Sequence, residues 1–69
     1  MTPKFSLGQT IKHVNDPDID AGKIVHISVN DSRVLYTIEI EEWNPQTRSI
    51  FKAVKHIEES EAMEVEENE

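Results

Sequence analysis

The chain has 69 residues and no cysteine, so we expect one small domain without disulfides or thiolate metal sites. Its 14 acidic and 7 basic residues give a formal net charge of −7, which disfavours phosphate-bearing partners and favours basic ones. No apolar stretch approaches the length of a membrane span. The first residues are too polar for a signal peptide, so we expect a cytoplasmic protein.

The net charge is concentrated at the C-terminal end. Residues 1–57 hold all seven basic residues and seven acidic ones, so this part is neutral, 7 − 7. The last twelve residues hold seven glutamates and no base, which accounts for the whole −7. We therefore predict a compact domain at residues 1–65 and an acidic disordered tail at residues 66–69. A solubilising tail and a tail that folds back on a basic face both remain open.

Apolar and polar residues alternate with a period of two, and turn residues recur about every ten positions, a pattern typical of small all-β barrels and sandwiches. We expect a first strand at residues 10–14, a polar loop, and a second strand at residues 23–29. In the second strand one face would carry Val25, Ile27 and Val29. The opposite face would carry Ile24, His26 and Ser28.

The third strand has the clearest alternation, with one apolar and one mixed face. The two sets are Val34, Tyr36, Ile38 and Ile40 on the apolar face and Leu35, Thr37, Glu39 and Glu41 on the mixed face. A turn at residues 44–47, with Pro45 suited to the second position of a type I turn, leads to a fourth strand at about residues 48–55. The sequence does not decide which face of this strand points toward the core, because Ile50 and Val54 compete with Phe51 and Ala53.

Two structures compete after His56. In one, residues 56–59 form a helical turn and residues 62–65 a fifth strand. In the other, a helix or a disordered acidic segment begins at residue 57. Glu and Ala favour helix, but like charges at helical spacing weaken it. A chain this short also needs Met63 and Val65 in its core, so the strand is the preferred interpretation. We place Phe5, Tyr36 and Phe51 in the core as well.

Sequence spacing argues against a metal site and against catalysis. Three aspartates at alternate positions resemble a calcium loop, but Ala21 and Ile27 occupy the positions that require Gly and Glu. The histidines lack the spacing of metal ligands, and no nucleophile or oxyanion loop accompanies them. We predict no metal, no cofactor and no enzymatic activity. The residues considered are Asp16, Asp18, Asp20, His13, His26 and His56.

Trp43 is the main candidate for a binding residue, because it falls at the end of the third strand beside two acidic residues. An exposed Trp at a loop edge can anchor a partner; alternatively, it covers an open end of the barrel. The predicted partner-binding residues are Trp43, Tyr36, Glu41, Glu42, Glu58, Glu59 and Glu61. We expect a non-catalytic module, a monomer or weak dimer, that acts as adaptor or regulator of a basic protein. One special case is an acidic inhibitor that imitates phosphate toward a DNA-binding partner, as some phage-encoded inhibitors do.

The alternative function is nucleic-acid binding through a basic side of the barrel, regulated by the acidic end. Its predicted binding residues are Lys12, Lys23, Arg48, Lys52 and Lys55.

Residues 5–13 read Phe-Ser-Leu-Gly-Gln-Thr-Ile-Lys-His, and residues 22–25 read Gly-Lys-Ile-Val. With five short strands, this pattern resembles the SH3-like small barrels, which include Tudor-type and KOW-type modules. More narrowly, residues 5–13 resemble the opening of the bacterial hemimethylated-DNA-binding/heat-shock protein Q family. This chain is shorter, lacks that family's long loop and extended tail, and places Trp43 differently. The resemblance implies a five-stranded SH3-like barrel that acts as a DNA-linked or protease-linked binding domain.

Overall fold

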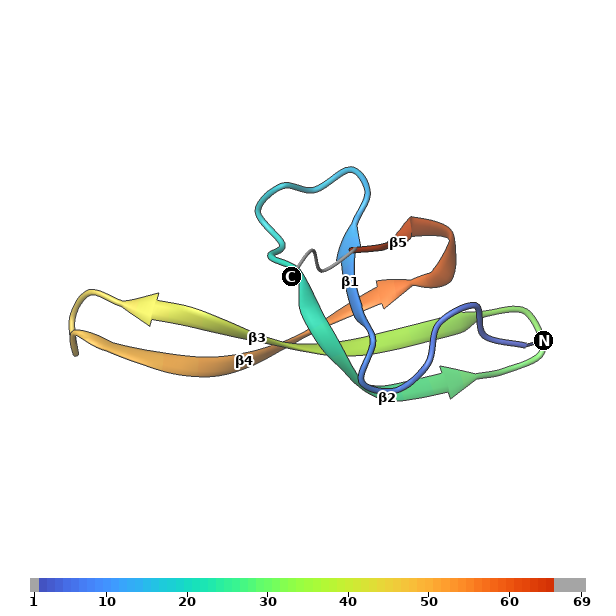
Figure 1. Cartoon of the computed structure of the whole chain (residues 1–69), viewed down its shortest axis with the longest axis horizontal. Helices are drawn as coiled ribbons and strands as arrows, with labels where there is room; N and C mark the ends of the chain where they lie inside the picture. Colours follow the sequence, from blue (N-terminus) through green and yellow to red (C-terminus); the bar gives the residue numbers. More distant parts are fainter. Residues whose placement is uncertain (1, 66–69) are drawn as a thin grey trace.

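The computed structural model describes residues 2–65 as one antiparallel sheet of five strands, which confirms the all-β class. The strands are β1 (Thr10–His13), β2 (Gly22–Val29), β3 (Val34–Asn44), β4 (Ser49–Glu58) and β5 (Ala62–Glu64), and a 3-10 turn, η1 (Glu59–Glu61), precedes β5. The sheet order is β4-β3-β2-β1-β5 (Figure 1). In the described part of the chain β4 and β5 do not pair with each other, so a closed barrel stays a prediction. The predicted tail at residues 66–69 lies outside the described residues.

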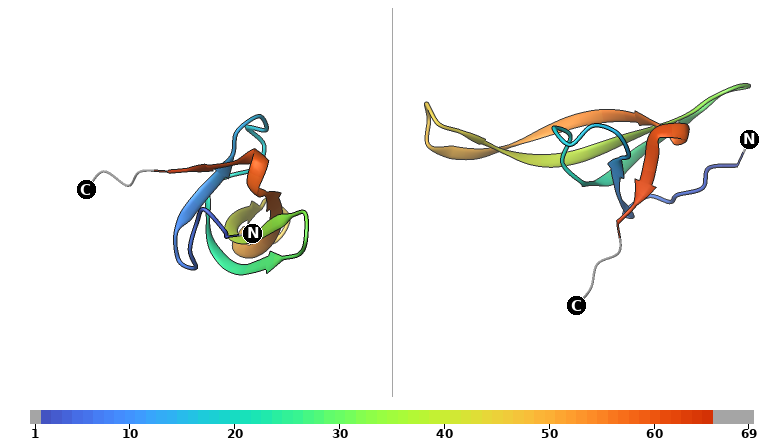
Figure 2. Two further views of the ribbon diagram at one scale, coloured as in Figure 1. Left: turned by 90° about the vertical axis from the view of Figure 1, so that its right-hand side faces the viewer. Right: turned by 90° about the horizontal axis from the view of Figure 1, so that it is seen from above.

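The sheet curls around a small core, and the β3–β4 hairpin extends beyond it (Figure 2). The alternation predicted for β3 is confirmed, because one face of this strand supplies four of the buried side chains. Half-buried residues, Phe5 and Ile27 among them, pack around these. The buried core consists of Ile11, Ile24, Val34, Tyr36, Ile38, Ile40 and Ile57.

The two clean faces predicted for β2 are wrong, because the strand contains a bulge. Its register with β3 shifts between Ile24 and His26. The extra residue at a bulge changes which side chains share a face. As a result Ile24 is buried and Ile27 is half-buried, while Val25 and Val29 are exposed. The core therefore receives residues from both of the predicted faces.

The structure decides the inward face of β4, which the sequence left open. Ala53 and Ile57 face the core, whereas Ile50 and Val54 are exposed. The prediction that Phe51 belongs to the core is wrong, since 43% of this residue is exposed. Phe51 lies opposite Glu42, on the part of the hairpin that extends beyond the core.

The C-terminal segment forms a helical turn and then a short strand, as the preferred interpretation predicted. The turn η1 begins three residues later than expected, and β5 pairs with β1 at Ile11, Lys12 and His13. Ala62 packs against the core, but Met63 faces outward opposite Lys12 and is 49% exposed. The core position predicted for Met63 is therefore wrong, because side chains alternate along this strand.

Candidate protein-interaction site

The β3–β4 hairpin continues past the rest of the sheet. β4 pairs with β3 as far as Asn44 and Ser49, whereas the pairing of β2 with β3 ends at Lys23 and Glu39. Residues 40–53, here called the distal hairpin, are therefore a two-stranded ribbon that projects to the left in Figure 1. A ribbon of two strands has no third strand and no second layer that could cover its apolar side chains.

Large apolar side chains lie uncovered on the distal hairpin. Trp43 is 59% exposed, and Ile50, its direct cross-strand neighbour, is 63% exposed. Val54 follows on the same face with 55% exposed, and Phe51 lies on the other face. Trp43 therefore lies on the projecting ribbon and does not cover an open end of the sheet. Trp43 and Ile50 thus form an exposed apolar pair across both strands, and Lys52 separates this pair from Val54; exposed apolar surface is a common property of interaction sites.

The distal hairpin and the three residues next to it carry balanced charges. Residues 39–55 contain three glutamates and three basic residues, so their net charge is zero, 3 − 3. Lys52 Nζ lies 3.1 Å from Glu39 Oε1, and Lys55 Nζ lies 4.0 Å from Glu42 Oε1. These pairs are partly exposed and contribute little to stability. The predicted residues Glu41 and Glu42 thus lie on a neutral ribbon beside Trp43.

Tyr36 and Glu59, both predicted to contact a partner, hold the N-terminal segment on the sheet. The Tyr36 hydroxyl donates to Glu59 Oε2 at 2.7 Å and accepts from the Phe5 N–H at 3.2 Å. Glu59 Oε2 also accepts from the Lys4 N–H at 3.0 Å. The Lys4 bond, followed by the Tyr36 bond, lowers the pKa of Glu59, while burial, followed by the Glu59 bond, raises the pKa of Tyr36. Tyr36 is fully buried, so it offers no surface to a partner, and we correct that prediction.

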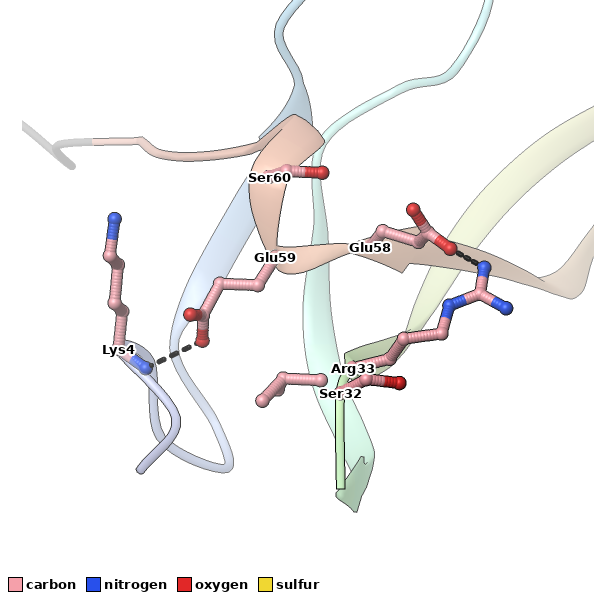
Figure 3. A pocket seen from close by; sticks show the side chains of 7 residues that line it. Lys4, Ser32, Arg33, Glu58, Glu59 and Ser60 are labelled. Atoms are coloured by element: carbon pink, nitrogen blue, oxygen red, sulfur yellow. Dashed lines mark hydrogen bonds and ion pairs between the residues drawn. The ribbon is translucent and has the colours of Figure 1, made fainter. Parts of the chain in front are cut away.

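Two further acids of the predicted set also have partners within the chain. Glu58 forms an ion pair with Arg33, and Glu61 lies 2.5 Å from His13 Nε2. Figure 3 shows Arg33 directed at Glu58 beside an open surface pocket of about 280 Å³. Arg33 compensates the charge of Glu58, and His13 occupies one carboxylate oxygen of Glu61, so this end is less open to a basic partner than the sequence suggested. The pocket is lined by Lys4, Ser32, Arg33, Val34, Glu58, Glu59 and Ser60.

Among the basic residues of the alternative function, Lys12, Lys23 and Lys52 lie on the outer face of the sheet, as the strand registers show. Lys52 and Lys55 are three positions apart on β4, so their side chains leave opposite faces of the sheet. Arg48 lies in the hairpin turn, while Lys12 and Lys23 belong to β1 and β2. Nucleic-acid binding usually requires a continuous basic footprint, and Glu39 and Glu41 of β3 lie between Lys23 and Lys52 on the outer face.

Residues 2–65 show neither a metal-ligand cluster nor a helix that could span a membrane. Among residues 2–65, no three acidic or histidine side chains gather as metal ligands would. The only helical segment in that range is η1, three residues long, whereas a membrane-spanning helix needs about 20. Neither feature therefore adds a candidate site.

Comparisons with protein-family models, curated proteins and solved structures give no match. The resemblance of residues 5–13 to the hemimethylated-DNA-binding/heat-shock protein Q family therefore stays a prediction. The distal hairpin is thus identified as a candidate site from its geometry and surface chemistry.

Proposed function

We propose that this protein is a non-catalytic protein-binding module, an adaptor or regulator on an SH3-like small barrel, and that the distal hairpin is its contact surface. The observation that carries the proposal is the exposure of Trp43 beside Ile50 on a ribbon that extends beyond the core. Trp is enriched among residues that dominate binding energy. Burying one large apolar side chain contributes about 1.5–3 kcal/mol.

The charges of the hairpin indicate the kind of partner surface that fits. A neutral ribbon with cross-strand ion pairs suits an apolar pocket for Trp43 that is surrounded by charges of both signs. The net charge of −7 acts at longer range and favours encounter with a basic protein, an effect on association rate more than on affinity. Added salt should therefore slow association while the Trp43 contact persists.

The same hairpin gives less support to nucleic-acid binding. A two-stranded ribbon can enter the major groove of DNA, but this ribbon would bring Glu41 and Glu42 toward the phosphates along with its two basic residues, Arg48 and Lys52. Lys52 on the ribbon and Lys55 beyond it also leave opposite faces of β4. These features favour a protein partner.

The experiment is affinity capture from bacterial lysate, with and without nuclease treatment, on the immobilised full-length protein. Trp43→Ala is compared with Leu7→Ala, because Leu7 is 65% exposed but lies before β1, outside the hairpin. We expect a specific protein to be retained by the unchanged chain and by Leu7→Ala, and at least tenfold less by Trp43→Ala. Equal retention by all three, or retention that disappears with nuclease, would contradict the proposal.

A further inference from the structure

β4 is a long edge strand with a free side. It spans Ser49–Glu58 and, among the described strands, pairs with β3 alone. Residues 49–52 are all exposed. The other edge strand, β5, has only three residues. Unpaired backbone groups on a long edge can accept a further strand. We propose that β4 takes an extended acidic segment of the partner protein as a sixth strand; this inference rests on the proposed function.

The side chains of β4 specify which segment fits. On the face that carries Trp43, β4 presents Ile50, Lys52 and Val54 in alternation, apolar, basic, apolar. Arg48 and Lys55 add charge nearby, and residues 48–57 contain no acid. Cross-strand pairs stabilise a sheet when opposite charges and apolar groups face each other. A complementary segment therefore has an acidic residue opposite Lys52 and an apolar residue opposite Ile50.

β3 already shows that such a segment pairs well with β4. Across its other edge, β4 has Glu41 opposite Lys52 and Trp43 opposite Ile50. The two β4 lysines remain accessible to a second acidic strand, since 67% of the Lys52 side chain and 44% of the Lys55 side chain are exposed.

A second copy of the chain is a poorer occupant than an acidic segment. Pairing β4 with β4 of another molecule would bring two sets of the same basic residues, Arg48, Lys52 and Lys55, to one junction without any acid between residues 48 and 57. Like charges on neighbouring strands are destabilising. Lysines on an edge are also a common protection against self-pairing. The same residues thus disfavour self-association and favour an acidic strand.

The first test uses a capped peptide, Thr-Ile-Glu-Ile-Glu-Glu-Trp-Asn, which copies residues 37–44. Added to the full-length protein, it should slow amide hydrogen exchange at alternate residues of β4, because alternate N–H groups of a strand point to the same side. Two versions of the peptide are N-methylated on alternate amides. Each version therefore blocks the N–H groups along one of the two edges of the peptide. We expect one to lose binding at least tenfold and the other to retain it. Loss by both, loss by neither, or faster exchange in β3, would overturn strand addition.

The second test reverses charge at matched positions. Lys52→Glu should weaken binding of the peptide about fivefold, as expected for a like-charge cross-strand pair. A peptide with lysines in place of its glutamates should bind this variant better than it binds the unchanged protein. Lys12→Glu makes the same change of net charge on β1 and should leave both affinities unchanged. Equal effects of the two variants, or dimerisation through β4, would contradict the inference.

These tests separate the inference from the proposed function. Trp43 projects from β3 and does not lie on the free edge of β4, so Trp43→Ala should abolish partner capture and leave peptide addition unchanged. If capture depends on Trp43 but the N-methylated peptides bind alike, the inference is wrong and the proposed function stands. If capture does not depend on Trp43, the proposed function is wrong.

Discussion

Replacing Tyr36 with Phe removes one hydroxyl from the contact between the N-terminal segment and the sheet. This hydroxyl donates to Glu59 at 2.7 Å and accepts from the Phe5 N–H at 3.2 Å. The ring itself would remain buried and keep its edge contact with Phe5, at a centroid distance of 5.6 Å. A buried hydrogen bond contributes about 1 kcal/mol, and one that involves a charged group about 1.5–3 kcal/mol. Because Phe5 is only half-buried and water can replace part of its bond, we expect Tyr36→Phe to lose about 2 kcal/mol.

Thermal and urea unfolding measure this loss. For a domain of this size, 1 kcal/mol corresponds to about 4–8 °C, so the melting temperature should fall by about 8–16 °C. The control is Thr37→Val, which removes the neighbouring but exposed hydrogen bond between Thr37 Oγ1 and His56 Nδ1 and should change stability by less than about 0.5 kcal/mol. Tyr36→Phe and Glu59→Gln should also be non-additive. If Tyr36→Phe were no more destabilising than its control, the reasoning would be refuted.

Three further predictions concern stability. Hydrogen bonds hold the pKa of Glu59 below 4.5, so its stabilising contribution is complete above that pH and disappears as pH falls through the lower folded value. The urea midpoint should therefore decline in acid, and less steeply in Glu59→Gln. A Cβ at Gly22 would lie 2.4 Å from the Glu39 carbonyl oxygen, so Gly22→Ala should lose about 3 kcal/mol in urea unfolding. Gly8→Ala meets only the strain of a φ of 86° and should lose about 1 kcal/mol; the reverse order would contradict this account. Trp43→Ala should change the free energy of unfolding by less than about 0.5 kcal/mol, and a larger loss would show that Trp43 packs within the fold.

The sequence indicates most of the strands of the sheet. It also indicates how far the buried core extends along β3. The inward positions of β3 are apolar up to Ile40 and then polar at Glu42 and Asn44, although pairing with β4 continues to Asn44. The strand therefore extends beyond the core. This signal could have identified the projecting ribbon and the exposure of Phe51, the residue for which the predicted core position is wrong.

Other features depend on contacts that no local pattern contains. The bulge after Ile24 appears only when β2 and β3 are paired. Glu59 forms hydrogen bonds with Tyr36, which is 23 positions away in the sequence, and with the Lys4 backbone, which is 55 positions away. Glu61 meets His13 from 48 positions away. A run of glutamates reads as a free acidic surface until the fold supplies these partners, which is why part of the predicted site proved to be structural.

The most direct test of the central claim is amide hydrogen exchange on the full-length protein, alone and in complex with the protein captured in a Trp43-dependent manner. We predict that protection on binding maps to residues 40–53 and the adjoining part of β4, with little change in β1 and η1. Protection concentrated instead around Glu58, Glu59 and Glu61, with the hairpin unaffected, would contradict the account.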